Sequence, residues 1–291
     1  MLETKSKVST KVYIIKGSDP YETTKKLLEK MKFSLSNKKV FIKANVHPNK
    51  IVSADVNVVR AVLEKLKNCK VVIGGNIGIT CKPFNINNYY DLEEEFDVKL
   101  LDLDKDDAVI KKVREPIRFK EFPAAKSVVD ADYVINVAKL KIHSHAKVTM
   151  CLKNLFGCIP GRIRLTIHPF INDAIHDYMQ VFRSDLNIID GIVGNQNDEI
   201  IPHPIRSNIM IGGYDALCVD VVGTRCMDVD PEEVEYLKLL NYDSRNIEVI
   251  GEKIEDVMKK YNRKRLTTTS IRYFIESCSR LAIKLNKSDK K

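Results

Sequence analysis

The most chemically versatile side chains of this chain are the lysines and histidines that lie between residues 132 and 168. Lysine offers a positive charge to an anion, and histidine can transfer a proton or bind a metal near neutral pH. A strand predicted to end at Asn136 and Val137 comes directly before them. Ligands of parallel α/β sheets bind beyond the carboxyl ends of strands. The segment therefore predicts a site for a carboxylate, a phosphate or a nucleotide.

One hypothesis is an enzyme that acts on a small anionic metabolite. Its candidate catalytic residues are His143, for acid–base chemistry, and Lys153, for neutralising substrate charge. The candidate binding residues are polar side chains in or near predicted strand ends: Lys43, Asn45, Lys139, Lys141, Asn154 and Asp190. Asp190 would orient the substrate or bind a metal. We expect six of these residues to converge at one end of the sheet: Asn45, Lys141, His143, Lys153, Asn154 and Asp190.

Several polar residues also have an ordinary structural interpretation. Lys141 and His143 could belong to a solvated loop, because lysine is common in loops. Four further residues are interpreted as structural, the last two in a solvated loop: His145, His168, Asp198 and Glu199.

A second hypothesis is a redox or metal-handling accessory protein that acts with a partner. It would use Cys81, Cys151 and Cys158 together with neighbouring histidines. None of the seven cysteines forms a C-x-x-C pair, so we expect no cubane iron–sulfur cluster in the isolated chain. In a reducing compartment these cysteines are typical of small buried hydrophobic residues. The sequence leaves the metal, the cofactor and the oligomeric state open.

Strand and helix patterns alternate around these residues. Short apolar runs predict strands at residues 11–15, 40–42, 70–73, 133–137, 186–189, 208–211 and 247–250. Asp19 and Asp230 each precede a proline and are predicted helix N-caps, and a helix is also predicted over residues 58–66. Residues 84–125 are difficult to assign and are expected to hold insertions. The pattern favours an α/β fold with a mainly parallel sheet and helices on both faces, with or without a sub-lobe.

The positive charge of the chain is concentrated at its C-terminus. The 291 residues carry a net charge of +9, and residues 259–291 contain eleven Lys/Arg against two Asp/Glu, a balance of +9. Residues 1–258 are therefore close to neutral, and nucleic acid is not an expected partner. We expect a single α/β domain over residues 1–258 and a basic extension over residues 259–291.

The basic extension contains an apolar stripe at helical spacing from Ile271 to Leu285, which predicts an amphipathic helix. This helix either docks on the body of the protein or makes weak contact with an anionic membrane surface or an acidic partner. No apolar run is long enough for a transmembrane helix. The polar N-terminus shows no signal peptide, so a cytoplasmic location is expected.

Two motifs in the central segment carry a family resemblance. The run K-L-K-x-H over residues 139–143, followed by L-K-N-L-F-G-x-x-P-G over residues 152–161, resembles the signature of domain of unknown function 362. Weaker agreement extends from about residue 40 to residue 251. The resemblance implies an uncharacterised α/β protein. Many members of that family carry a ferredoxin-like insert, and the cysteine pattern of such an insert is missing from this chain.

A second, fainter resemblance concerns the nickel-pincer lactate racemase group. It rests on the order of six residues: His143, Ala146, Thr149, Lys153, Pro160 and Gly161. The loop lengths differ from those of that group. This resemblance implies a related fold and site position, and it does not extend to the chemistry.

Overall fold

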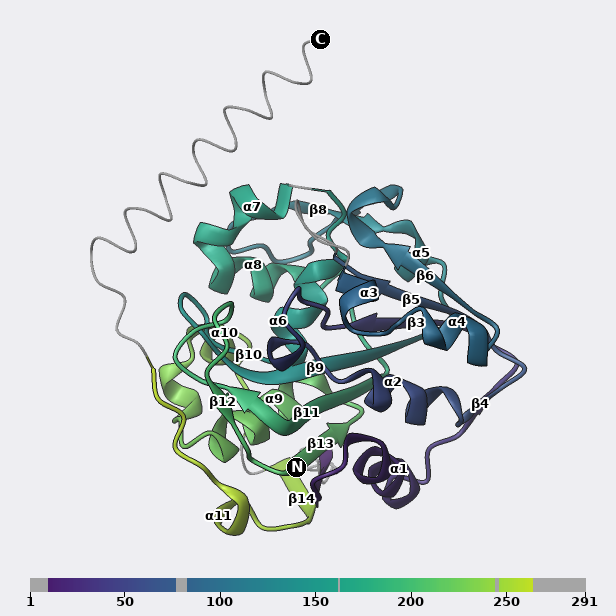
Figure 1. The fold of residues 1–291 in the computed structure, drawn as a ribbon. Coiled ribbons are helices and arrows are strands. Elements are labelled where there is room, and N and C mark those ends of the chain that lie inside the picture. Colours follow the sequence, from purple (N-terminus) through teal and green to yellow (C-terminus); the bar gives the residue numbers. More distant parts are fainter. Residues whose placement is uncertain (1–9, 77–82, 162, 244–245, 264–291) are drawn as a thin grey trace, which may run out of the picture.

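A long mixed β-sheet forms the centre of the molecule (Figure 1). The computed structural model describes residues 10–76, 83–161, 163–243 and 246–263. The strands of the main path lie in the order β14, β1, β13, β11, β9, β3, β5 and β6. Their bounds in chain order are β1 Thr10–Lys16, β3 Lys39–Ala44, β5 Lys70–Gly75, β6 Val98–Asp102, β9 Tyr133–His143, β11 Leu186–Asn195, β13 Ile209–Gly213 and β14 Ile247–Gly251.

The neighbouring strands β11, β9, β3, β5 and β6 are all parallel, with Phe41 of β3 opposite Val134 of β9 and Val72 of β5. Strand β13 is antiparallel to both of its neighbours. Two short strands extend the sheet in antiparallel pairs: β10 (Lys147–Thr149) with β9 and β12 (Pro204–Ile205) with β11. The expected mainly parallel α/β sheet is confirmed.

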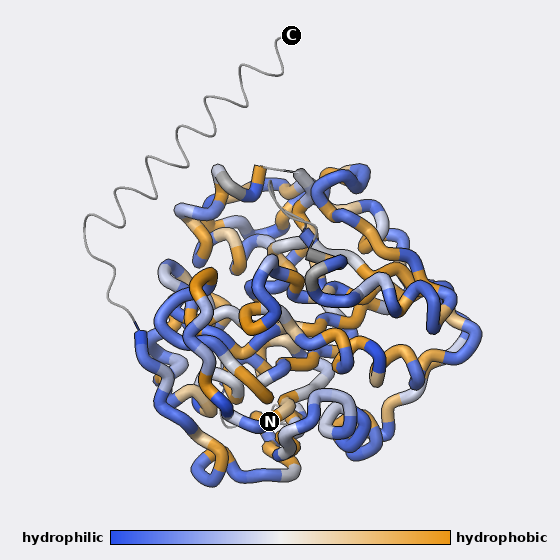
Figure 2. The backbone as a smooth tube through the Cα atoms, in the orientation of Figure 1, coloured by the Kyte–Doolittle hydropathy of each residue, from blue (hydrophilic) through white to orange (hydrophobic). Residues whose placement is uncertain are grey.

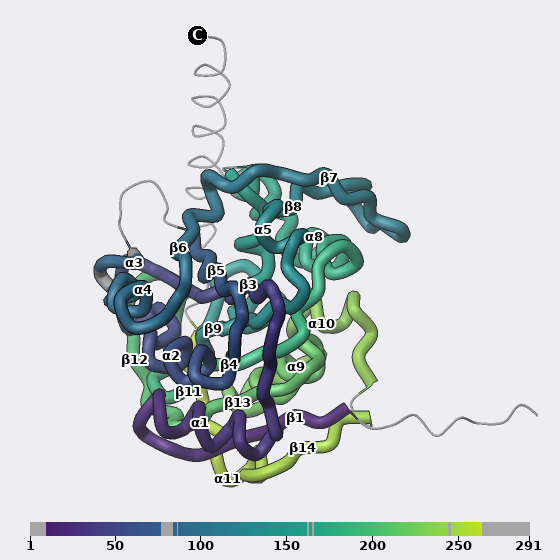
Figure 3. Tube along the Cα trace, turned by 90° about the vertical axis from the view of Figure 1, so that its right-hand side faces the viewer, coloured from purple at the N-terminus to yellow at the C-terminus, as the bar shows by residue number. Residues whose placement is uncertain are grey.

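Helices cover both faces of this sheet, as Figure 3 shows from the side. One face packs against α1 (Pro20–Lys30), α2 (Val56–Leu63), α3 (Pro83–Ile86) and α4 (Asp91–Glu95). The other face packs against α5 (Lys126–Val129), α6 (Cys151–Leu155), α8 (Ile171–Tyr178), α9 (Ala216–Cys226), α10 (Glu235–Leu239) and α11 (Ile254–Val257). Helix α7 spans Ile163–Ile167. Hydrophobic residues accordingly occur throughout the body rather than in one half of it (Figure 2).

The chain changes face between the adjacent strands β3 and β9. From β3 it continues through α2 on one face to β5, whereas from β9 it continues through α6, α7 and α8 on the other face to β11. The two connections therefore leave the sheet in opposite directions at the carboxyl ends of neighbouring strands. Such a topological switch point opens a crevice in which α/β proteins bind ligands.

Strand β9 is longer than predicted, and this difference bears on the site. The sequence prediction ended the strand at Val137, with the lysines and histidines in the following loop. In the structure β9 continues to His143, and the polar Lys139, Lys141 and His143 alternate with Leu140 and Ile142. The alternation puts the three polar side chains on one face and the apolar side chains in the core on the other. These residues are strand residues, and the solvated-loop interpretation of Lys141 and His143 is wrong.

Other predicted elements differ in smaller ways. The helix expected after Asp230 is divided into a 3₁₀ turn, Pro231–Glu233, and α10. Helix α2 ends before Leu66, which pairs with Leu35 in a small sheet of β2 (Leu35–Ser36) and β4 (Leu66–Lys67). Within residues 84–125 lie β6, which joins the main sheet, and the hairpin of β7 (Ala108–Lys112) and β8 (Glu121–Ala125).

The predicted amphipathic helix over residues 271–285 lies outside the described residues, and the domain boundary near residue 258 stays a prediction. No helix among the residues that the structure describes is long and apolar enough to span a bilayer.

Candidate functional site

A pocket of about 290 Å³ lies at the crevice between β3 and β9. Six of the predicted site residues line it: Lys43, Asn45, Lys141, His143, Lys153 and Asn154. They come from the end of β3, from the second half of β9 and from α6. Asn76, directly after β5, and Glu199, shortly after β11, complete the lining from the neighbouring strands. The carboxyl ends of four adjacent strands thus contribute to one small cavity.

The side chain of Asn154 organises the β3 side of the pocket. Its Oδ1 accepts hydrogen bonds from Lys43 Nζ at 3.3 Å and from Asn45 Nδ2 at 3.2 Å. Its Nδ2 donates to Asn136 Oδ1 at 2.8 Å and to the backbone oxygens of Val137 and Lys43. Both polar atoms of this buried amide are therefore engaged within the protein, and Asn154 positions Lys43 and Asn45.

Gly157 allows Lys43 to reach the pocket. A Cβ atom at this position would lie 2.4 Å from Asn76 Oδ1 and 2.8 Å from Lys43 Cε, closer than van der Waals contact permits. Asn76 Nδ2 also donates to Gly157 O at 2.9 Å. Position 157 therefore has to be glycine, because only a residue without a Cβ atom lets Lys43 and Asn76 pack against the backbone there.

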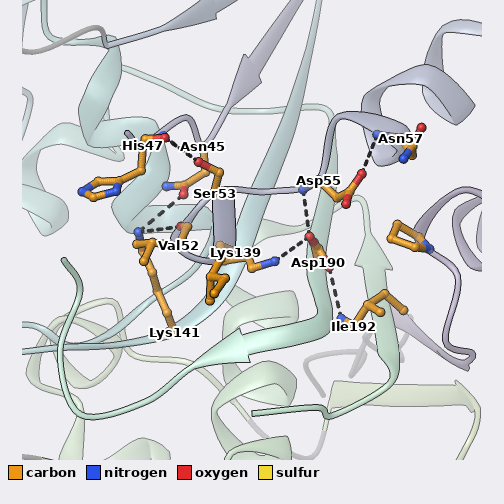
Figure 4. A network of polar contacts seen from close by, with 12 residues as sticks. Asn45, His47, Val52, Ser53, Asp55, Asn57, Lys139, Lys141, Asp190 and Ile192 are labelled. Carbon is orange, nitrogen blue, oxygen red and sulfur yellow. Dashed lines mark hydrogen bonds and ion pairs between the residues drawn. The ribbon is translucent and has the colours of Figure 1, made fainter. Parts of the chain in front are cut away.

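Lys141 lies on the opposite wall, under the segment that joins β3 to α2. Its Nζ donates to Val52 O at 3.2 Å and approaches Asn45 Oδ1 at 3.5 Å (Figure 4). Burial and the nearby positive charge of Lys153 lower the pKa of Lys141 to about 7. A substantial fraction of Lys141 is thus a neutral amine at neutral pH.

Two further lysines of the pocket have lowered pKa values. Burial lowers the pKa of Lys43 and of Lys153 to about 8 in each case. Lys153 is partly buried, and its Nζ lies 5.1 Å from the ring centre of Phe156. Glu199 is the only carboxylate among the described lining residues. Positive charge therefore exceeds negative charge in the cavity, an arrangement that favours an anionic ligand.

Lys139 and Asp190, which were predicted in the same site, do not line this pocket. Lys139 Nζ lies 2.8 Å from Asp190 Oδ2, and both side chains are buried. Asp190 also accepts hydrogen bonds from the backbone N–H groups of Asp55 and Ile192 (Figure 4). The pair borders a separate depression and connects β9 and β11 to the start of α2. The contacts of Lys139 and Asp190 therefore indicate a structural role for the pair.

His143 is held in one tautomer by the turn that follows β9. Its Nδ1 accepts hydrogen bonds from the backbone N–H groups of His145 and Ala146, both at 3.1 Å. Burial, followed by the charge of Lys153, lowers the pKa of His143 well below its ordinary value, so the ring is neutral. Because Nδ1 faces two donors, the single ring proton lies on Nε2. His143 is therefore a hydrogen-bond donor to the pocket.

Glu199 lies in the loop after β11, as predicted, but it is half-buried there and lines the pocket. Its carboxylate accepts from the backbone N–H of Ser144 at 2.8 Å and from the Ser144 hydroxyl at 2.7 Å. The same hydroxyl lies 3.0 Å from His145 Nδ1. Because the hydroxyl proton points to Glu199, Ser144 Oγ accepts the proton of His145 Nδ1. This chain of contacts fixes the turn that carries the two histidines.

His143, His145 and Glu199 could together approach a metal ion, since one potential ligand atom of each lies within 4.8 Å of the others. Histidine ligands of metals normally donate their second ring N–H to an acceptor. His143 has the opposite arrangement, because its Nδ1 accepts two N–H groups. Binding a metal through Nε2 would require the imidazolate form. The geometry favours an oxygen atom of an anion as the partner of His143.

The cysteines named in the redox hypothesis are poorly placed for it. Cys151 and Cys158 are buried, and burial raises the pKa of Cys158 to about 11 and that of Cys151 well above its ordinary value. Both thiols are therefore protonated near neutral pH, whereas metal binding and redox exchange need the thiolate. Cys81 lies outside the described residues.

Among the lining residues that the sequence interpretation did not assign to the site are His47, Asn76, Arg164, His168 and Glu199. His168 stacks on His143 with ring centres 5.3 Å apart, and Arg164 forms an ion pair with Asp104. Asn76 carried a usable signal, because it directly follows a predicted strand. The other four reach the site through tertiary packing, which the local sequence pattern does not encode.

The fold and the site define a doubly wound α/β protein with a cationic pocket at its switch point. The family described as Domain of unknown function (DUF362) matches residues 40–225, and the chain belongs to this family. The matched segment contains β5, β9, β11, α6 and all of β3 except Lys39, and therefore the elements that form most of the pocket.

A curated relative is the thylakoid-associated protein sll1697 of Synechocystis sp. (strain ATCC 27184 / PCC 6803 / Kazusa), which is 30% identical over 124 residues. The match covers 40% of this chain and 39% of that protein. This chain thus matches less than half of the length of that relative.

Two solved structures are similar to this chain at low sequence identity. A protein from Thermotoga maritima has a TM-score of 0.43 and 14% identity, over 69% of this chain and 57% of that one. The lactate racemase apoprotein from Thermoanaerobacterium thermosaccharolyticum has a TM-score of 0.40 and 12% identity, over 77% of this chain and 58% of that one.

Proposed function

We propose that this protein is an enzyme that binds a small metabolite carrying a carboxylate or phosphate group. The proposal rests on three lysines that line the same pocket, Lys43, Lys141 and Lys153. With pKa values of about 8, Lys43 and Lys153 are mostly charged at neutral pH. Their charges exceed that of Glu199, the one carboxylate among the described residues of the pocket wall, so a bound anion would restore the balance.

The neutral donors of the pocket support the same class of ligand. The Nε2–H of His143 can donate a hydrogen bond to an anionic oxygen without adding positive charge. The volume of about 290 Å³ is near the lower end of the range for ligand pockets, which favours a metabolite of a few carbon atoms. Lys153 is the candidate for holding the anion and for moving a proton.

Binding of unreactive anions tests this proposal directly. Purified full-length protein is titrated with inorganic phosphate and, separately, with oxalate in an isothermal titration calorimeter at constant ionic strength. We expect at least one anion to bind, and we expect Lys153→Gln to weaken its binding by about tenfold, the effect of losing roughly 1.4 kcal/mol. Lys105→Gln is the matched control, because Lys105 is 82% exposed and pairs with Asp102 outside the pocket.

Two outcomes would overturn the proposal. One is a wild-type protein that binds neither anion. The other is an equal loss of binding in Lys153→Gln and Lys105→Gln, because a general charge effect would then account for the binding.

A further inference from the structure

The amine of Lys141 is buried against neutral hydrogen-bond acceptors. Among the described residues, the acceptors near its Nζ are Val52 O at 3.2 Å and Asn45 Oδ1 at 3.5 Å. An ammonium group has three N–H donors, whereas a neutral amine has two donors and one lone pair. With two hydrogen bonds made to the protein, Nζ has one position left for the pocket that it lines, which is a third N–H in the ammonium form and a lone pair in the neutral form.

Lys139 provides a contrast on the same face of the same strand. It lies two residues before Lys141, and its ammonium group forms the buried ion pair with Asp190. Lys139 lines the neighbouring depression with Asp190, whereas Lys141 lines the cationic pocket. The fold thus places a carboxylate against one lysine of β9 and neutral oxygens against the other. A lysine without a carboxylate partner is costly to bury, which favours a chemical role over a structural one.

We propose that Lys141 is a nucleophilic amine and that the metabolite of this pocket carries an aldehyde or ketone group beside its anionic group. The proposal rests on the proposed function and deepens it, because it specifies the class of substrate. Lys43 and Lys153 would hold the carboxylate or phosphate. The carbonyl carbon would then lie against Lys141 Nζ.

The reaction is the condensation of an amine with a carbonyl compound. The lone pair of Lys141 Nζ forms a bond to the carbonyl carbon, and the electron pair of the C=O π bond moves to the oxygen. The ammonium group of Lys153 passes protons to this oxygen and takes up those that Nζ loses. Water then departs as the C=N bond forms. In net terms, both hydrogen atoms of the released water come from the Lys141 amine, so atoms and charge balance.

Reductive trapping tests the proposal at the level of single residues. Full-length protein is incubated with glyoxylate, an aldehyde with a carboxylate, or with dihydroxyacetone phosphate, a ketone with a phosphate. Sodium borohydride then reduces any imine to a stable secondary amine, and peptide mass spectrometry locates the adduct. We expect at least one of the two compounds to modify Lys141 about tenfold more than the exposed Lys105. The reacting compound identifies the anionic group that the pocket prefers.

Competition and variants complete the test. Excess oxalate or phosphate should suppress the adduct, Lys141→Met should abolish it, and Lys105→Gln should retain it. If an unreactive anion binds but neither carbonyl compound modifies Lys141 above Lys105, the nucleophile proposal is wrong while the anion proposal stands. If no anion binds, the proposed function itself fails. Should Lys141→Met not fold, the peptide map of the wild-type protein decides the question alone.

Discussion

The side-chain amide of Asn154 contacts Lys43 twice, because Oδ1 accepts from Lys43 Nζ at 3.3 Å and Nδ2 donates to Lys43 O at 3.3 Å. One residue of α6 thereby fixes both the backbone and the ammonium group of the lysine near the end of β3. Asp220 fixes the start of the same helix, since its carboxylate accepts the N–H groups of Cys151 at 2.8 Å and Leu152 at 3.0 Å. The pocket is therefore positioned by buried polar contacts that also stabilise the fold.

We expect Asn154→Ala to lower both stability and anion affinity. The substitution removes the donor of the buried Asn136 Oδ1 and one of the two acceptors of Lys43 Nζ, which keeps its hydrogen bond to Ala44 O. Since a buried polar group left unsatisfied costs about 1–3 kcal/mol, chemical denaturation should show a loss of that size, and calorimetry should show weaker phosphate or oxalate binding. Asn172→Ala is the control, because Asn172 donates to Glu235 at an exposed site. Equal stability losses in the two variants would contradict the positioning role.

The ion pair of Lys139 and Asp190 should behave as a buried structural pair. Removing one charge leaves the other buried and unpaired, so Lys139→Met is expected to cost about 3–5 kcal/mol of unfolding free energy. Lys139→Met combined with Asp190→Asn should cost less than the sum of the single changes, because no uncompensated charge remains. A double-mutant cycle by urea denaturation measures this coupling. Additive losses would show that the two charges do not interact.

The sheet was predictable because its strands are short apolar runs bounded by turn and cap residues. Asp19 accepts from Glu22 N as the N-cap that its sequence context indicated. The end of β9 was misplaced because a fully buried run was taken as the whole strand. The alternation of Lys139, Lys141 and His143 with apolar residues was itself a strand signal of period two.

The sequence did not indicate that Lys141 would line the pocket while Lys139 would form a structural ion pair with Asp190. Lys139 and Lys141 have the same residue type, the same strand and the same face. They differ only in their partners, since Asp190 of β11 is opposite Lys139 whereas the segment after β3 covers Lys141. Glu199 is a loop residue, as predicted, but its place in the pocket wall depends on a contact with Ser144 that joins positions 55 residues apart. Tertiary contacts of this kind leave no local pattern.

The tautomer of His143 is open to direct observation. The two backbone donors at Nδ1 place the ring proton on Nε2, and the lowered pKa keeps the ring neutral in mildly acidic solution. Nitrogen-15 NMR of histidine-labelled protein should show an unprotonated Nδ1 and a protonated Nε2 from about pH 5.5 to about pH 8, although a free histidine titrates near about 6.5. The variant His143→Gln assigns the signal. A ring that becomes doubly protonated in this range would contradict the donor role.

The amine of Lys141 should leave a signature in the pH dependence of stability. Its folded-state pKa of about 7 lies below the ordinary value of 10.5. Between these two values the unfolded chain binds a proton that the folded chain has released, so this lysine makes unfolding free energy rise with pH. Below about pH 7 both states are protonated and its contribution is constant. Lys141→Met lacks this contribution at every pH.

The measurement is therefore a difference between two proteins. The unfolding free energy of the wild type minus that of Lys141→Met should be flat below about pH 7 and should rise by roughly 2 kcal/mol between about pH 7 and about pH 9. Loss of the contacts with Val52 O and Asn45 shifts this difference by a constant and leaves its slope unchanged. Lys105→Met is the control, and its difference from the wild type should have no such slope, because Lys105 is exposed. A flat difference for Lys141→Met would mean that the amine is charged in the folded protein, which would also remove the lone pair that the condensation requires.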